Sequence, residues 1–358
     1  MHVKLKLLLE ELCAIPGPSG QEDRVAAYMY EKFTPFADKC YIDKAGNCIA
    51  RFNGTSGRSI AVLGHMDEVY CVVDAIKDGF VYVRSGCALD TDNLDSVPVQ
   101  ILTQSGKIVK GVFGSSTIHL KKWEKTSEHF VDVGGDTDGI LPGDPVIYAP
   151  NMFWMNDHIV ASKALDDRHS CAILIQLAEM FAKERPKDTL YLIGTRMEEP
   201  CMHAGARYVA KTLPCDMYIS IDTNYGYAPT LPESKTWRIG DGPVIRRWER
   251  SPQAFTICFP SRRMTAALGK AGEELGIPFG FDIAETYTDA SGVYMVRSDV
   301  EICGINVARR YSHSAHEVVD LNDVIGYSIS GNTEIFMTPQ IWPRIFLCNL
   351  PLSMISTL

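Results

Sequence analysis

Four short apolar segments constrain the fold of this chain most strongly, because each leads toward a histidine or a carboxylate. Each segment has the length and apolar content of a buried β-strand, and stretches of helical periodicity separate them. Strands that alternate with helices predict an α/β fold with a mostly parallel sheet and helices on both faces. The predicted strands cover residues 60–63, 190–193, 217–221 and 300–307.

Helices are predicted from the same periodicity. Ser19 followed by Glu22 forms a capping box, which predicts that a helix begins there and runs to Phe33. Apolar residues at helical spacing predict the other helices over residues 3–13, 171–182, 265–275 and 322–336.

A change of sequence pattern interrupts this alternation between residues 69 and 161. Short valine-rich pieces alternate there with Gly, Asp and Pro, and long helical periodicity is absent. This pattern is typical of a small all-β unit. We therefore predict one α/β domain made of residues 1–68 and 162–358, with a β-rich domain inserted at residues 69–161.

Composition narrows the class of partner. A formal net charge of −9 over 358 residues argues against a nucleic acid as the main partner. No run approaches the roughly 20 apolar residues needed to span a bilayer, so no membrane association is expected. The sequence has 11 cysteines but no C-x-x-C pair, which predicts reduced, packed thiols in a cytoplasmic protein.

Five potential metal ligands fall near the ends of the predicted elements. In open α/β sheets, binding sites gather at the carboxyl ends of strands, so side chains placed there can converge. A mixed set of histidines and carboxylates suits zinc, cobalt or manganese. The set consists of His65, Asp166, Glu199, Asp222 and His313.

Charge balance favours two ions over one. Three carboxylates around a single zinc ion leave surplus negative charge, whereas two divalent cations with a shared hydroxide are neutralised. Such ions lie about 3.5–4 Å apart and need a bridging carboxylate, for which we choose Asp166. Glu198 is then free to handle a proton while its neighbour Glu199 binds a metal ion. Asp67, two residues after His65, fits a role in orienting the imidazole ring.

Each of these residues also has an ordinary structural explanation. Two adjacent glutamates can form a solvated loop, and a single histidine can bond a backbone carbonyl in the core. Asp67 can be an exposed turn residue, Asp166 can favour a helix N-terminus, and Asp222 can cap a turn. Further histidines near the motifs compete as ligands, namely His169, His203 and His316.

A series of short motifs runs along the chain in a distinctive order. The main ones are GHMDE, SKALDDR, RMEEP, SIDT and RRYSHSAHEVVD, accompanied by PGPSGQED, DKAGN, KGVFGSS and PGDPV. Together they resemble the di-metal aminopeptidases that form tetrahedral particles, the TET or glutamyl-aminopeptidase family. The resemblance covers nearly the whole chain to about residue 337. It implies a phosphorylase/hydrolase-like metallopeptidase core and a PDZ-like insert that drives dimerisation and dodecamer assembly.

The resemblance also implies a role for each site residue. Glu198 matches the catalytic base, and Asp67 matches the carboxylate behind His65. The Asp166–Asp167 peptide bond is expected to be cis. The implied ligands of one ion are His65, Asp166 and Asp222, and those of the other ion are Asp166, Glu199 and His313.

The expected function is metal-dependent release of N-terminal residues from peptides, with zinc or cobalt as cofactor and manganese also compatible. A di-metal deacylase or carboxypeptidase of related fold is one alternative, because Arg246 and Arg247 offer cations for a substrate carboxylate. A metal-independent glycoside hydrolase that uses Glu198 is another. The chain departs from the family at three places. It has Pro200-Cys201 where Val-Gly is common after the two glutamates, and His169 where a small residue is usual after DDR. It has SAHEV where a version with proline is common.

Overall fold

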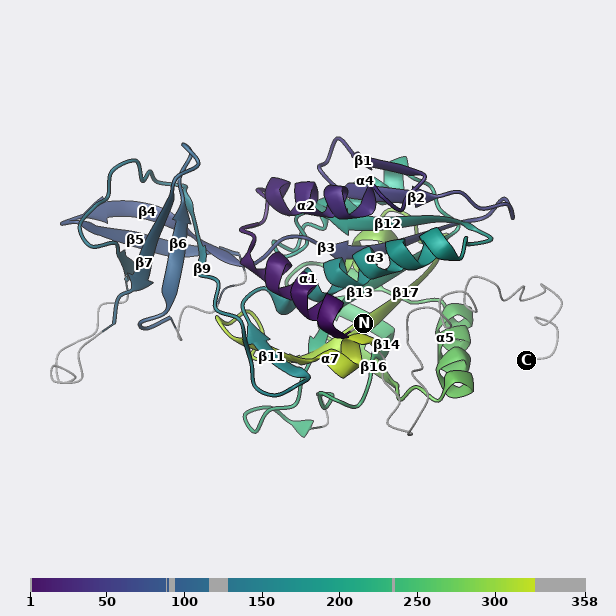
Figure 1. The fold of residues 1–358 in the computed structure, drawn as a ribbon. Coiled ribbons are helices and arrows are strands. Elements are labelled where there is room, and N and C mark those ends of the chain that lie inside the picture. Colours follow the sequence, from purple (N-terminus) through teal and green to yellow (C-terminus); the bar gives the residue numbers. More distant parts are fainter. Residues whose placement is uncertain (1, 88, 90–93, 116–127, 234–235, 326–358) are drawn as a thin grey trace.

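The protein is a large mixed sheet flanked by helices, with a small barrel to one side (Figure 1). The structure is a computed structural model and describes residues 2–87, 89, 94–115, 128–233 and 236–325. The 12-stranded sheet has the order β1-β2-β12-β3-β13-β17-β18-β11-β10, and β14 joins it at β17 and carries β15 and β16. Its strands are β1 (Lys39–Ile42), β2 (Cys48–Phe52), β3 (Ser59–His65), β10 (Phe153–Trp154), β11 (Ile159–Ser162), β12 (Thr189–Thr195), β13 (Met217–Tyr225), β14 (Val244–Ser251), β15 (Thr256–Cys258), β16 (Gly280–Ala284), β17 (Glu301–Arg310) and β18 (Glu317–Asp320).

Parallel pairing is concentrated at the centre of the sheet. β12, β3, β13 and β17 pair in parallel in that order, and these are the four strands predicted from the apolar segments. Outside this centre, β14 and β16 are parallel, while the other described neighbours are antiparallel. The prediction of a mostly parallel sheet is therefore wrong beyond the centre. Short connections, such as the turn between β1 and β2, join antiparallel neighbours, because a parallel pair needs a long crossover.

Helices cover both faces of the sheet, as predicted. α1, α2, α3, α5 and α7 contribute to the larger hydrophobic core on one face, and α4 and α6 contribute to the core on the other. The predicted helices over residues 3–13, 171–182 and 265–275 are confirmed; the part of the last predicted helix beyond residue 325 lies outside the described residues. The helices are α1 (His2–Ala14), α2 (Asp23–Phe33), α3 (Leu165–Lys183), α4 (Ala204–Thr212), α5 (Arg262–Leu275), α6 (Asp289–Tyr294) and α7 (Leu321–Ile325).

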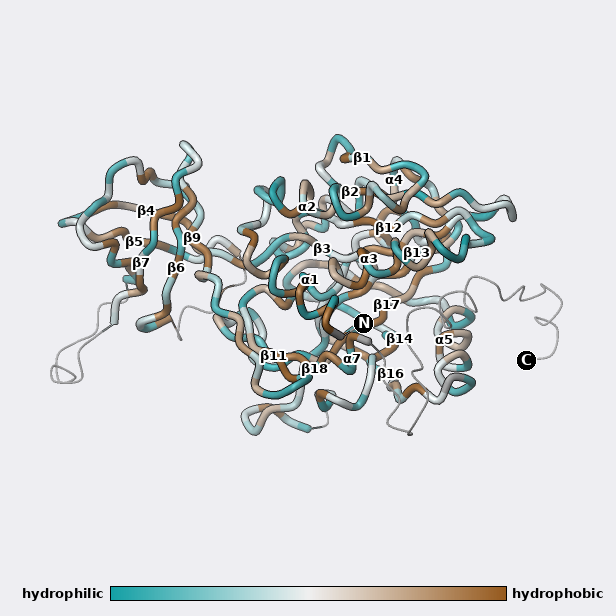
Figure 2. Tube along the Cα trace, in the orientation of Figure 1, coloured by the Kyte–Doolittle hydropathy of each residue, from teal (hydrophilic) through white to brown (hydrophobic). Residues whose placement is uncertain are grey.

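The central strands are apolar on both sides because both sides are buried. Along β3, Ile60 and Val62 join one core, while Ala61 and Leu63 join the other. Successive side chains of a strand point to opposite faces, so a continuous apolar run suits a strand covered by helices on both faces. Figure 2 shows hydrophobic residues along these strands. Burying each large aliphatic side chain contributes about 1.5–3 kcal/mol.

The start of α2 differs from the predicted capping box. Glu22 precedes the helix, but no side chain caps its first turn. Ser19 Oγ instead donates a hydrogen bond to Asp67 Oδ2 at 2.6 Å. Glu22 Oε1 accepts one from the Met197 backbone N–H at 3.1 Å. Both side chains thus form hydrogen bonds with residues that are distant in the sequence, and these tertiary contacts override the local helix-capping signal.

The barrel has its own hydrophobic core and is built from six antiparallel strands in the closed order β4-β5-β8-β7-β6-β9. Its strands lie within the insert predicted at residues 69–161, while β10 and β11 from the end of that range belong to the large sheet. Its likeness to a PDZ fold stays a prediction. The strands are β4 (Tyr70–Lys77), β5 (Phe80–Cys87), β6 (Pro98–Leu102), β7 (Ile108–Phe113), β8 (His129–Asp132) and β9 (Pro145–Tyr148).

A buried charge cluster ties the segment after β3 to the start of α3. Arg168 is fully buried, and its Nη2 lies 3.3 Å from Glu68 Oε1. Lys163 contacts the other oxygen of Glu68. Arg168 Nε also donates a hydrogen bond to the Met66 carbonyl at 3.0 Å. Because an unpaired buried charge is costly, this pairing fixes the position of two segments that carry site residues.

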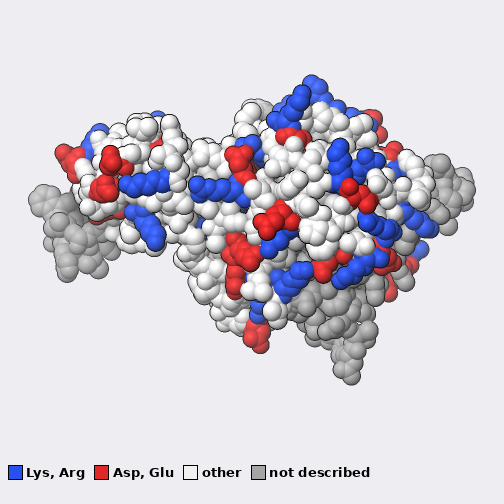
Figure 3. Space-filling model, turned by 45° about the horizontal axis from the view of Figure 1, so that its top comes forward, with Lys and Arg blue, Asp and Glu red and all other residues white. Residues whose placement is uncertain are grey.

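The surface carries charges of both signs. On the face shown in Figure 3, Lys and Arg side chains are interspersed with Asp and Glu. Within the described residues, each helix is either too short or too polar to cross a bilayer.

Candidate metal centre

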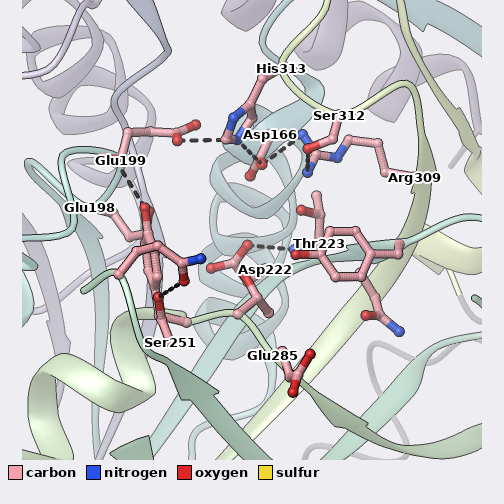
Figure 4. A pocket seen from close by; sticks show the side chains of 15 residues that line it. Asp166, Glu198, Glu199, Asp222, Thr223, Ser251, Glu285, Arg309, Ser312 and His313 are labelled. Carbon is pink, nitrogen blue, oxygen red and sulfur yellow. Dashed lines mark hydrogen bonds and ion pairs between the residues drawn. The ribbon is translucent and has the colours of Figure 1, made fainter. Parts of the chain in front are cut away.

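The predicted ligands lie around Asp166, and Figure 4 shows Asp166 with Glu199, Asp222 and His313. Asp166 lies at the start of α3, and its Oδ1 is 3.2 Å from Nε2 of His65, the last residue of β3. Its Oδ2 is 3.5 Å from Nε2 of His313, which follows β17. The same His313 nitrogen is 3.2 Å from Oε2 of Glu199, in the turn after β12. The carboxylate of Asp166 therefore lies between the two histidines, where a bridging ligand would lie.

Asp222, the fifth predicted ligand, lies within β13 rather than beyond its end. One carboxylate oxygen of Asp222 is within 4.8 Å of oxygens of both Asp166 and Asp167. Both carboxylate oxygens of Asp167 already accept hydrogen bonds within the protein. Oδ2 accepts one from the His65 backbone N–H at 3.0 Å, and Oδ1 accepts one from Ser170 Oγ. Asp222 is therefore the better placed of the two to bind an ion. The Asp166–Asp167 peptide bond is cis, as expected.

Glu198 is buried beside these residues and lines the same cavity. Its backbone carbonyl accepts a hydrogen bond from the N–H of Cys201 at 3.0 Å, which closes a turn that contains Pro200. This turn directs the two adjacent carboxylates to different neighbours. Glu199 faces the histidine after β17, whereas Glu198 Oε1 lies 3.6 Å from His203 Nδ1. The departure from Val-Gly at these positions thus lies in the turn that orients both glutamates.

Asp67 connects the two sides of the site. Its Oδ1 lies 3.3 Å from Nδ1 of His65, the ring nitrogen that faces away from Asp166. Oδ1 and Oδ2 also accept hydrogen bonds from the backbone N–H groups of Glu198 and Glu199, both at 3.1 Å. Asp67 is fully buried, so it holds the imidazole and the Glu198-Glu199 turn in fixed relation.

Replacing Asp67 with asparagine is expected to weaken metal binding by about 10- to 100-fold, because an amide cannot supply an acceptor at both oxygen positions. The dissociation constant can be measured by competition with a chromophoric chelator. Asp157→Asn, an exposed aspartate away from the site, serves as the matched control. Equal affinities for both variants and the wild type would show that Asp67 does not position the ligands.

Arg309 is a site residue that sequence reasoning missed. It is buried at the end of β17, and its Nη1 lies 2.8 Å from Asp166 Oδ2. It also pairs with Glu317, which accepts a hydrogen bond from the Asp166 backbone N–H at 3.0 Å. Although burial opposes ionisation, Arg309 and the two histidines bring the pKa of Asp166 well below its ordinary value. Arg309 therefore keeps the central carboxylate ionised.

The three competing histidines lie outside the group of ligands and do not line the cavity in the described part of the chain. His169 is buried and its Nδ1 lies 2.9 Å from the Leu165 carbonyl. Burial lowers the pKa of His169 to about 4, so its ring is neutral. His316 is exposed and its ring lies against Phe153, with 5.7 Å between the centroids. His203 is buried beside Glu198.

The charge and chemistry of the site fit divalent cations. Burial raises the pKa of Glu198 and of Asp222 well above their ordinary values, and it raises the pKa of Glu199 to about 7. Crowded buried carboxylates of this kind are costly without a compensating cation. Glu199 Oε1 is buried and has no hydrogen-bond partner, so it offers an open ligand position. Imidazole and carboxylate donors together suit zinc, cobalt or manganese.

The site opens into a cavity of about 300 Å³. The predicted ligands Asp166, Glu199, Asp222 and His313 line it together with Glu198, whereas His65 is not among the residues of the wall. The rest of the wall is polar and consists of Thr223, Asn224, Tyr225, Ser251, Gln253, Glu285, Thr286, Tyr287, Arg309 and Ser312.

The barrel contacts the site at two places. Tyr148 at the end of β9 donates a hydrogen bond to the backbone carbonyl of His313 at 3.3 Å, and Ala315 packs into the hydrophobic core of the barrel. Cys87 at the end of β5 has its Sγ 3.6 Å from Ser19 Oγ, which in turn bonds Asp67. The inserted barrel thus supports the loop that carries one predicted ligand.

The chain is similar to known aminopeptidases in sequence and in fold. A family profile described as M42 glutamyl aminopeptidase matches residues 46–328. Lysyl aminopeptidase of Pyrococcus furiosus is 26% identical over 334 residues, which cover 88% of this chain and 92% of the relative. Aminopeptidase APDkam598 of the archaeon Desulfurococcus kamchatkensis superposes with a TM-score of 0.83 at 27% identity, covering 90% of this chain and 92% of its own. The TET1 peptidase of Pyrococcus horikoshii, described as assembling into a tetrahedron or a large octahedral shell, has a TM-score of 0.78 at 25% identity and covers 89% of this chain and 96% of its own.

Proposed function

Because the chain belongs to the M42 glutamyl aminopeptidase family and is a hydrolase of peptide bonds, we propose that it releases N-terminal residues from peptides with two divalent metal ions. The observation that carries this proposal is the position of Asp166 between two histidines and two further carboxylates. In this proposal, His65, Asp166 and Asp222 bind one ion, and Asp166, Glu199 and His313 bind the other. Zinc and cobalt suit this donor set, and manganese is also compatible.

When held by these residues, two such ions would lower the pKa of a water molecule toward neutrality and polarise the scissile carbonyl. Glu198 is the general base in this mechanism: it takes the proton of the attacking water and passes it to the leaving amine. Its support is its position, because it is buried in the cavity next to Glu199 while remaining outside the group of ligands. Asp67 holds the ring of His65 and the turn that carries both glutamates.

The cations near the cavity favour an aminopeptidase over a carboxypeptidase. A carboxypeptidase needs a free cation for the substrate carboxylate. Arg246 is fully buried and reaches Asn224 at 3.3 Å, and Arg247 stacks on the ring of Phe281, so neither lines the cavity. Arg309 does line it but is committed to carboxylates of the protein. Among the described residues of the wall, no cation is left for a substrate carboxylate.

A comparison of substrates tests this proposal. We expect the metal-loaded protein to hydrolyse aminoacyl 4-nitroanilides and unblocked peptides, and to leave the same peptides intact when their N-termini are acetylated. The free α-amine is required because the cavity is lined by carboxylates that attract it. Cleavage of N-blocked peptides from the C-terminus would instead establish the carboxypeptidase alternative. The names of relatives do not decide the preferred N-terminal residue, since one is called lysyl and the family is described as glutamyl.

We also propose that the chain forms a homo-oligomer through its inserted domain, with a dodecamer as the assembly. The fold that it shares with the TET1 peptidase of Pyrococcus horikoshii supports this. All cysteines in the described part of the chain are free thiols, which supports a reducing compartment such as the cytoplasm.

A further inference from the structure

One carboxylate of the cavity has no partner within the protein. Glu285 follows β16, is exposed and lines the cavity. Among the described residues, no side chain or backbone N–H bonds its carboxylate, whereas the carboxylates of Asp166 and Glu199 both have partners. Figure 4 shows Glu285 on the opposite side of Asp222 from Glu199 and His313. Glu285 thus presents a negative charge to the cavity beyond Asp222, on the side away from Glu199 and His313.

Apart from Arg309 and the predicted ligands with Glu198, the wall around the rest of the cavity is polar and uncharged. It contains hydroxyl and amide side chains, and no aliphatic side chain lines it among the residues that the structure describes. An apolar substrate side chain would strip water from these groups without replacing their hydrogen bonds, which costs free energy. A long polar side chain can keep those bonds. The members of this wall are Asn224, Tyr225, Ser251, Gln253, Thr286 and Tyr287.

An acidic substrate side chain would find no partner here. Arg309 is the cation of the described wall, and it already pairs with Asp166 and Glu317. A substrate carboxylate would therefore lie opposite Glu285 with nothing to neutralise it, and like charges disfavour such binding.

We propose that Glu285 selects peptides whose N-terminal residue is lysine or arginine. This inference rests on the proposed aminopeptidase function. The α-amine is attached to the carbon next to the scissile carbonyl, so it must stay close to the metal ligands. A lysine ammonium stands on a flexible four-carbon stem and reaches farther into the cavity, toward the unpaired carboxylate. The polar wall then lies along the stem while Glu285 pairs with the charge.

The experiment compares kcat/KM for the 4-nitroanilides of Lys, Leu and Glu with the full-length, metal-loaded protein. We expect the order Lys, then Leu, then Glu. In Glu285→Gln, the ratio of the Lys value to the Leu value is expected to fall roughly 10-fold, between the effects typical of exposed and buried charge pairs. Asp282→Asn removes a carboxylate from the same strand outside the cavity wall and is expected to keep the wild-type ratio.

Two results would overturn the assignment of Glu285. An equal fall for Lys and Leu in Glu285→Gln would mean that this carboxylate binds the α-amine common to all substrates. A wild-type preference for Leu or Glu that Glu285→Gln leaves unchanged would mean that it selects nothing. If the wild type released none of the three residues, the aminopeptidase proposal itself would fail, which is a different outcome from cleavage without basic preference.

Discussion

Replacing Glu198 with glutamine is expected to reduce kcat by about 10²- to 10⁴-fold while leaving the metal content unchanged. Glutamine has the same shape as glutamate but cannot accept the proton of the attacking water, and general-base catalysis contributes about this much to rate. Because Glu198 lies in the cavity outside the group of ligands, its loss removes no metal ligand. Steady-state kinetics on the best aminoacyl anilide, with metal analysis of the same sample, measure both quantities.

Glu199→Gln is the matched control for this experiment. Glu199 is the adjacent residue, and its Oε2 lies 3.2 Å from His313 Nε2. We expect this variant to lose metal as well as activity, since an amide oxygen is a weaker ligand than a carboxylate. Excess metal should then restore part of its activity but none of that of Glu198→Gln. Retention of most activity by Glu198→Gln would refute its assignment as the base.

Replacing Asp166 with alanine is expected to have the largest effect on metal binding, with loss of both ions. Its two oxygens lie 3.2 Å from His65 Nε2 and 3.5 Å from His313 Nε2, so one carboxylate serves both halves of the site. Activity should fall on the order of 10³-fold or more, because metal activation is worth several kcal/mol. Metal analysis after gel filtration measures the number of ions that remain.

His313→Ala separates loss of one ion from loss of both. His313 Nε2 lies near Asp166 and Glu199, on the side of the site away from Asp222, so its removal should leave the half of the site that contains His65 and Asp222 able to bind one ion. Unfolding of each variant in excess chelator shows whether the metal-free proteins remain folded. If Asp166→Ala retained one tightly bound ion, Asp166 would not bridge two sites.

The centre of the sheet could be predicted from the sequence, whereas β14, which branches from β17, could not. β3 and β12 are uninterrupted apolar runs because helices cover both of their faces. β14 also belongs to this sheet, but its sequence contains the buried Arg246 and Glu249, and its register with β16 shifts between Arg246 and Trp248. Glu249 accepts hydrogen bonds from Thr288 and Ser291, and those partners become neighbours only in the folded chain. A local pattern therefore cannot identify this strand.

The candidate site, like the sheet, could be predicted from the sequence only in part. Carboxylates and histidines at the ends of apolar strands could be predicted as a group, and the resemblance to a family assigned their roles. The role of Arg309 could not be predicted, because a second arginine, Arg310, follows it and the sequence does not show which of the two reaches the site. In the structure the two diverge: Arg309 contacts Asp166, whereas Arg310 Nε donates to the Tyr227 carbonyl at 2.8 Å. Adjacent residues of a strand point to opposite faces, and the sheet around them decides which one reaches the site.

The most direct test of the account is a titration of the metal-free protein with zinc or cobalt, in which bound metal and aminopeptidase activity are measured on the same samples. The proposed site predicts that tight binding ends at two ions per chain, that activity rises with the bound ions, and that a chelator abolishes activity reversibly. Full activity in the metal-free protein, or tight binding that ends at one ion per chain, would contradict a two-metal aminopeptidase.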